Sequence, residues 1–132
     1  MRIAVLASAM LALAAFAACA PCAANAAGEQ RHPDVVSVKA KPAGGDRFDF
    51  DVTVSSPYDT PQRYADAFRV TTLKGAVLGE RILLHDHSSE QPFTRDLYGV
   101  SIPAGVRTVR VQARDMKHGY GGRTVDVTVP GR

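Results

Sequence analysis

Cysteine is missing from the sequence after residue 26, because Cys19 and Cys22 both lie in the first 26 of its 132 residues. The remaining 106 residues therefore cannot form a disulfide, and they offer no thiolate as nucleophile or metal ligand. An excess of charge of one sign is missing as well. Apart from Arg2, 15 Lys and Arg residues oppose 13 Asp and Glu residues, with no basic run. This balance argues against nucleic acid or an anionic membrane as the main partner.

The first 26 residues differ from the rest in composition. Arg2 is their only charge, residues 3–20 are mostly Ala, Leu, Val, Met and Phe, and Ala24-Asn25-Ala26 is a small-x-small site. These features predict a secretory signal peptide over residues 1–26 and a periplasmic or secreted mature chain that begins at Ala27, without a membrane span. The alternative is a lipoprotein site at residues 16–19, with Cys19 acylated and kept, although Leu is more usual than Phe at its first position.

A helical hydrophobic stripe is also missing from residues 27–132, where apolar residues recur with a period of two. After a polar leader over residues 27–33, seven strands are predicted over residues 34–41, 46–55, 67–73, 76–85, 93–102, 107–115 and 123–129. Val36 and Val38 are the apolar positions of the first strand. Seven short strands without a helix predict an all-β, immunoglobulin-like or fibronectin-like antiparallel sandwich over residues 34–132. The residues predicted to face its core are Phe48, Phe50, Val52, Phe68, Val70, Val109, Val111, Val125 and Val127.

The alternating directions of the strands, here called strand parity, determine at which end of such a sandwich each loop lies. If consecutive strands alternate in direction, the loops over residues 56–66, 85–92 and 116–122 lie at one end, together with the leader. All four histidines then gather there, and loops on one end of a rigid sandwich often carry binding residues. Candidate ligand-binding residues at this end are Tyr58, Tyr64, Asp86, Glu90, Met116 and Tyr120.

His85 and His87 lie two residues apart, so that their rings point to the same side of an extended chain. With His118 they could bind zinc or copper, helped by His32 or Met116. The structural alternative makes His85 a strand-end side chain, leaves His87 solvated and lets His118 brace its own loop.

Glycine-rich residues 119–122 allow the backbone to approach another group closely, either a ligand or a neighbouring loop, and bracing of a neighbour is the preferred interpretation. Asp86 or Glu90 could act as a general base beside a metal-bound water. However, the sequence contains no nucleophile elbow and no other catalytic signature, so we expect no enzymatic activity.

Six segments together resemble a family of small exported bacterial proteins of unknown function. They are Tyr64-Ala65-Asp66, Val77-Leu78-Gly79, Leu83-Leu84-His85, Glu90 to Arg95, Ile102 to Val106 and His118 to Gly122. The family often has Pro at the position of Asp86 and Trp at that of Phe68. The resemblance implies no activity and transfers no functional residues.

Together these observations predict an exported binding module that uses the histidine and tyrosine loop end, with copper or zinc as the first ligand to test. The alternative is a metal-free protein-interaction or accessory domain with structural histidines.

Overall fold

The computed structural model describes residues 29–132, and the predicted signal peptide with both cysteines lies outside them. The described residues form seven strands: β1 (Asp34–Gly44), β2 (Arg47–Ser55), β3 (Ala65–Thr72), β4 (Val77–Ile82), β5 (Phe93–Ser101), β6 (Thr108–Asp115) and β7 (Gly119–Thr128). There is no helix among residues 29–132, and so none that could cross a membrane. The all-β prediction is therefore confirmed.

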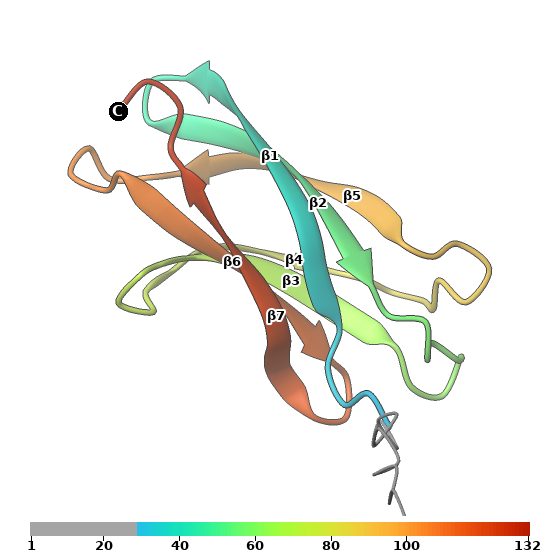
Figure 1. Cartoon of the computed structure of the whole chain (residues 1–132). Helices are drawn as coiled ribbons and strands as arrows, with labels where there is room; N and C mark the ends of the chain where they lie inside the picture. Colours follow the sequence, from blue (N-terminus) through green and yellow to red (C-terminus); the bar gives the residue numbers. More distant parts are fainter. Residues whose placement is uncertain (1–28) are drawn as a thin grey trace, which may run out of the picture.

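The strands form two antiparallel sheets packed face to face (Figure 1). One sheet has three strands in the order β1-β2-β5, and the other has four in the order β4-β3-β6-β7. Along one side of the sandwich β1 runs beside β7, and along the other β4 runs beside β5. This division confirms the predicted immunoglobulin-like or fibronectin-like sandwich.

Alternating Phe and Val residues from both sheets fill the space between them. On β2, Phe48, Phe50, Val52 and Val54 are all buried, while the side chains between them face outward. Truncating one buried Phe of this kind typically costs about 3 to 5 kcal/mol. The predicted core residues of β7, Val125 and Val127, pack on this core but are only partly buried, because β7 is an edge strand.

Three local expectations were wrong. The first strand bulges between Val35 and Ser37, so Val35 is buried and Val36 is 42% exposed. The fourth strand ends at Ile82, before the histidines, instead of reaching His85. The last strand begins at Gly119, so residues 119–122, expected in a loop, belong to β7, and the first three of them pair with β6.

The strand-parity prediction is confirmed. The β2–β3, β4–β5 and β6–β7 connections and the N-terminal segment all lie at one end of the sandwich, which we call the histidine end (Figure 1). Hydrogen bonds join these connections: the His87 N–H to the Asp59 carboxylate, Arg63 to Asp115, and the His32 ring to the Gly119 carbonyl.

Candidate functional site

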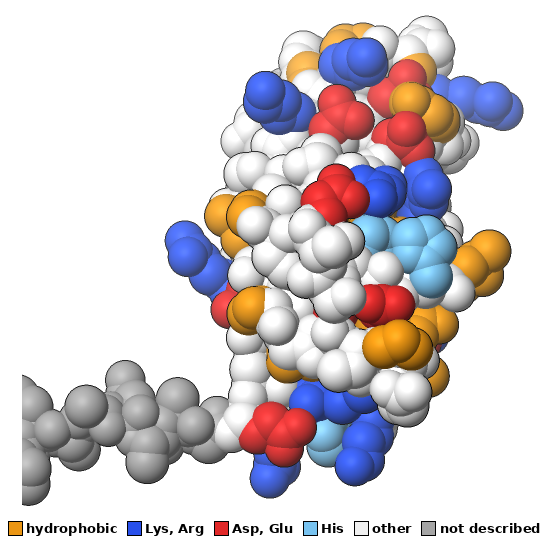
Figure 2. All heavy atoms as spheres, turned by 90° about the vertical axis from the view of Figure 1, so that its right-hand side faces the viewer, with side chains coloured by type: hydrophobic (Ala, Val, Ile, Leu, Met, Phe, Trp, Pro, Cys, Tyr) orange, Lys and Arg blue, Asp and Glu red, His pale blue; other side chains and the backbone are white. Residues whose placement is uncertain are grey.

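The four histidines form two separate pairs. The ring centroids of His85 and His87 are 4.8 Å apart, and those of His32 and His118 are 6.2 Å apart. Histidine side chains accordingly appear in two distinct places on this face of the molecule (Figure 2). Within residues 29–132 no group of three or more His, Cys, Asp or Glu side chains is placed to hold a metal ion. The structure thus brings His85 to His87 as expected, but it does not bring His118 to them.

This separation follows from two buried carboxylates that hold different loops. Asp59, in the β2–β3 connection, accepts hydrogen bonds from the backbone N–H of Ala65 at 3.1 Å and of His87 at 3.0 Å. Gln91 adds to this brace: its side chain accepts from the Ser56 N–H at 2.7 Å and donates to the His87 carbonyl at 3.0 Å. The backbone around His87 is therefore fastened to the β2–β3 connection.

The second buried carboxylate, Asp115, ends β6. Its Oδ2 accepts from the backbone N–H groups of Lys117 and His118, both at 2.9 Å, and its Oδ1 lies 3.2 Å from Arg63 Nε. Arg63 also donates to the Glu29 carboxylate at 2.6 Å and to the Gln30 carbonyl at 2.7 Å. Burial alone would raise the pKa of Asp115, but hydrogen bonds from its neighbours lower it overall. His118 is thus held beside the N-terminal segment.

His87 is a core residue and not a solvated one, which corrects the structural alternative drawn from the sequence. Only 4% of it is exposed, and its ring stacks on Phe93 with centroids 3.9 Å apart and planes 10° from parallel. Its Nδ1 is buried without a hydrogen-bond partner. Burial, followed by the positive charge of Arg95 and by His85, lowers the pKa of His87. The ring is therefore neutral at neutral pH.

His85 is exposed and held by its own loop. Its Nδ1 lies 2.8 Å from the Asp86 carbonyl oxygen. Because a carbonyl oxygen only accepts, Nδ1 carries the proton and the Nε2 lone pair of the neutral ring is free. Asp86 itself accepts from the Ser88 N–H at 3.3 Å and from its hydroxyl at 2.6 Å, and these bonds lower the pKa of Asp86.

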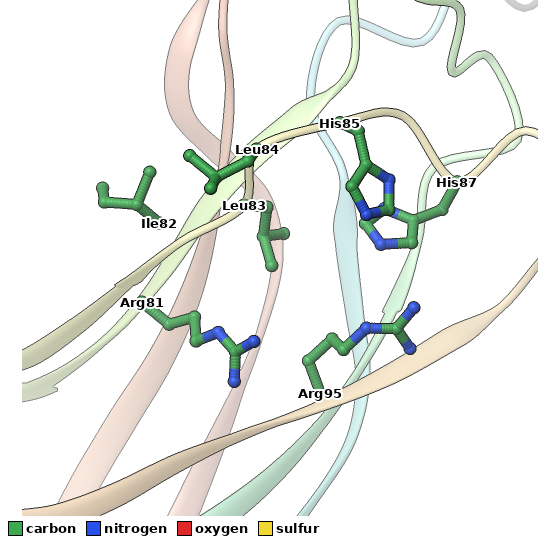
Figure 3. Close-up of a pocket in the computed structure, with 7 residues that line it drawn as sticks. All are labelled: Arg81, Ile82, Leu83, Leu84, His85, His87 and Arg95. Carbon is green, nitrogen blue, oxygen red and sulfur yellow. The ribbon is translucent and has the colours of Figure 1, made fainter.

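The two rings border a cavity of about 150 Å³ between the end of β4 and the start of β5 (Figure 3). The guanidinium groups of Arg81 and Arg95 approach this space from the opposite side (Figure 3). The residues that line it are Arg81, Ile82, Leu83, Leu84, His85, His87 and Arg95. No carboxylate is among them, so the polar part of the lining consists of guanidinium and imidazole groups.

Each arginine of the cavity has one carboxylate partner. Arg95 holds Glu90 through two hydrogen bonds of 3.1 and 3.2 Å, which lower the pKa of Glu90. Arg81 pairs with Asp96 on β5, using NH1 for both the carboxylate and the backbone carbonyl. Glu90 is therefore an ion-pair partner in this structure. The Arg81–Asp96 pair links the two sheets along the β4–β5 side.

The other candidate ligand-binding residues do not converge on the cavity. The Tyr58 ring lies under the Arg63 guanidinium at 4.1 Å, its hydroxyl is buried near Asp115, and burial raises the pKa of that hydroxyl. Tyr64 is half-buried, and Met116 is exposed beside the turn into β7. Tyr120 lies on the outer face of the four-stranded sheet, 3.7 Å from Arg69, with its hydroxyl bonded to Glu80. Tyr120 was expected in a loop, but it is the second residue of β7, and its side chain projects from the sheet.

The glycine-rich residues 119–122 pack closely against the N-terminal segment. This agrees with the interpretation preferred from the sequence, in which they brace a neighbouring segment. A Cβ on Gly121 would lie 2.6 Å from the His32 ring, and one on Gly122 would lie 2.2 Å from the Pro33 carbonyl oxygen. Gly122 also has a φ of +73°, which L residues rarely adopt. The His32 Nδ1 donates to the Gly119 carbonyl at 3.1 Å.

The sequence did not reveal that Asp59 and Asp115 organise this end, nor that Arg81 and Arg95 meet at the cavity. Asp59 binds His87, 28 residues away, Asp115 binds Arg63, 52 residues away, and Arg81 binds Asp96 on the other sheet, whereas Arg95 pairs with Glu90, only five residues from it. The one available signal was an acidic residue at the end of an alternating strand, since Asp115 continues the inward series of Val109, Val111 and Ala113.

No protein-family profile and no solved structure matches the chain. The chain is similar to a protein of the haloarchaeon Halomicrobium mukohataei named "Putative lipoprotein", with 42% identity over 97 residues. These residues are 74% of this chain and 47% of that protein, so the chain spans about half the length of the curated relative it matches. The chain is thus a distant relative of a protein named as a lipoprotein, and that name assigns no ligand and no reaction.

Proposed function

We propose that the protein is an exported binding module whose cavity at the histidine end takes a small oxyanion, such as a carboxylate or phosphate group. The observation that carries this proposal is the composition of the lining: two guanidinium groups, two imidazoles and no carboxylate. The guanidinium groups donate hydrogen bonds and carry positive charge, which suits planar or tetrahedral oxyanions.

The two ion pairs leave donors for a ligand. Among the described residues, Arg95 Nε has no hydrogen-bond partner, and Arg81 uses only NH1. These free guanidinium N–H groups can therefore donate to an oxyanion.

The rim of the cavity is apolar. Ile82 and Leu84 line it and are largely exposed, Leu84 to 83%. Exposed apolar side chains beside cationic groups favour a ligand that joins an oxyanion to an apolar portion. A protein partner offering an acidic and apolar segment would meet the same requirements, as in the metal-free alternative.

Export rests on the sequence and on the relative. The predicted leader and the name of the haloarchaeal relative both support transfer across a membrane. That name also favours the lipoprotein route, in which Cys19 is acylated and tethers the domain. A tether there would place the histidine end, where the described chain begins, toward the membrane.

Titration with sodium phosphate and with sodium acetate, followed by amide NMR, tests the proposal. Amide signals near His85, His87 and Arg95 should shift. Arg95→Gln should weaken binding about tenfold, the loss of one charge-assisted contact, about 1.4 kcal/mol. The matched control Arg110→Gln changes an arginine on the outer face of the four-stranded sheet and should have no effect. Absence of shifts with both anions would contradict the proposal.

A second candidate ligand, copper or zinc, is favoured by the His85 tautomer. Metal-binding histidines commonly donate one ring N–H to a carbonyl and bind through the other nitrogen, as His85 is arranged to do. His87 is neutral, as a ligand must be, but only two imidazoles meet, and the two arginines oppose a cation.

Metal analysis of the protein purified from its native compartment, with copper and zinc titrations, tests this candidate. If the metal is bound through His85 and His87, His85→Ala should abolish the binding. His118→Ala should leave it unchanged. Retention of metal by His85→Ala would assign the ion to other residues.

A further inference from the structure

The outer face of the three-stranded sheet carries polar side chains in cross-strand rows. In one row Ser37 of β1, Thr53 of β2 and Thr94 of β5 lie side by side. In the next row Lys39 is opposite Asp51, which is opposite Asp96. These residues alternate with the buried residues of the core, so that their side chains project to the same outer surface.

The groups in these rows are only partly paired with one another. The Thr53 and Thr94 hydroxyls are 2.8 Å apart. Lys39 and Asp51, although directly opposite each other, form neither an ion pair nor a side-chain hydrogen bond among the described residues. A depression of about 240 Å³ lies over this region, lined by Ser37, Lys39, Asp51, Thr53 and Thr94.

The outer face of the four-stranded sheet shows a contrasting arrangement. Arg114 holds Asp66 at 2.8 and 3.2 Å, and Arg110 holds Asp126 at 2.8 and 3.1 Å. Tyr120 on that face is covered by Arg69. The polar groups of one face thus satisfy each other, whereas the side chains of Ser37, Lys39 and Asp51 around the depression on the other face have no partner among the described residues and remain available to a ligand.

An exposed aromatic ring borders the same polar surface. Tyr98 continues the outward series of β5 after Thr94 and Asp96, and it is 66% exposed. The carboxylates of Asp96 and, more weakly, of Asp51 and Asp49 raise the pKa of Tyr98, so its hydroxyl lies close to this acidic row. A broad, exposed ring beside hydroxyl, ammonium and carboxylate groups offers both a stacking surface and hydrogen bonds.

We infer that the outer face of the β1-β2-β5 sheet binds an uncharged oligosaccharide, with the depression around Lys39 and Asp51 taking its hydroxyl groups and Tyr98 contacting a sugar ring. Sugar hydroxyls both donate and accept, which matches adjacent carboxylate, ammonium and hydroxyl side chains. Lys39 and Lys41 stand opposite Asp51 and Asp49 on this face, so the charges balance and an uncharged ligand fits better than a polyanion. The depression and the histidine–arginine cavity have no lining residue in common, so the inference stands apart from the proposed oxyanion site.

Titrating the isotope-labelled exported protein with cellohexaose, mannohexaose and chitohexaose, each followed by amide NMR, tests the inference. At least one oligosaccharide should shift the amides of β1, β2 and β5 with a Kd of about 1 mM or tighter. Tyr98→Ala and Asp51→Asn should each weaken that binding about tenfold. Asp126→Asn makes the same change on the opposite outer face and should leave the affinity unchanged.

Three results would overturn the inference. They are no shift with any of the three sugars, shifts confined to the histidine end or to the four-stranded sheet, and binding that survives both Tyr98→Ala and Asp51→Asn. Because both side chains project from the sheet surface, the variants are expected to keep the wild-type spectrum elsewhere. If Tyr98→Ala perturbs the fold, Tyr98→Phe, which keeps the ring, must retain binding while Asp51→Asn loses it.

Discussion

The imidazole of His87 lies flat on the ring of Phe93, with centroids 3.9 Å apart and planes 10° from parallel. This stack makes a histidine of the candidate site part of the hydrophobic core. The site and the stability of the fold are therefore coupled at one residue, and the two histidines of the pair should respond differently to substitution.

Replacing His87 with Ala should lower the free energy of unfolding by about 1 to 3 kcal/mol, because it removes a buried stacked ring. His87→Phe keeps the stack and removes the buried nitrogen that has no partner, so it should stay within about 1 kcal/mol of wild type. His85→Ala, at an exposed position, should change stability by less than about 0.5 kcal/mol. Chemical denaturation compares the three. Equal losses for His85→Ala and His87→Ala would contradict the structure.

Stability should fall as the pH drops below about 6.5, the usual pKa of an unfolded histidine. Burial, Arg95 and His85 lower the pKa of folded His87, while Asp59 and Glu90 act weakly in the opposite direction. The unfolded chain therefore binds a proton that the folded chain resists, and the loss continues down to the folded pKa. Denaturation midpoints between pH 5 and 8 measure it, and His87→Phe should flatten this part of the profile. An unchanged profile in that variant would assign the effect to other groups.

Gly121→Ala should destabilise the protein by about 1 to 3 kcal/mol, because the new methyl group would overlap the His32 ring. Adding His32→Ala should recover much of that loss, since the obstruction disappears. Gly105→Ala is the matched control, because its Cβ would meet nothing within 4 Å and its φ is not positive. Thermal unfolding of the single and double variants checks the coupling. Simple additivity of the two changes would show that His32 does not occupy this position.

Asp115→Asn should cost about 2 to 4 kcal/mol, because it leaves Arg63 without its buried charge partner and weakens the support of the β6–β7 turn. Asp126→Asn, in the exposed pair with Arg110, should cost at most about 1 kcal/mol. Urea denaturation of both variants provides the comparison, and a similar small cost for the two would remove Asp115 from its proposed bracing role.

The mature N-terminus decides between the two export routes. Cleavage after Ala26 gives a soluble chain beginning at Ala27, whereas lipoprotein processing leaves an acylated Cys19. The intact mass of the exported protein distinguishes them, and Cys19→Ser should release the protein from membranes only in the second case. A mass that retains residues 1–26 would contradict both routes.

Much of the fold could be predicted because alternating residues such as Phe48, Phe50 and Val52 report directly on which face is buried. Strand parity then placed the histidines at one end without further information. The division into two pairs could not be predicted, since it depends on hydrogen bonds that Asp59 and Asp115 accept from distant loops. The bulge at Val36 and the early start of β7 were missed because both follow from pairing with a neighbouring strand.

The contact between the start of β1 and β7 affects how the domain would resist a pulling force. Asp34, the first residue of β1, accepts a hydrogen bond of 2.7 Å from the Arg123 N–H, and from there β1 and β7 run side by side in the same direction (Figure 1). A pull on the N-terminus against the C-terminus would act along both strands at once. Contacts loaded in shear must break together, whereas contacts opened from one end break in turn. Tension on a tether at the N-terminus would therefore be resisted along the length of the sandwich, with the histidine end as the point where the force enters.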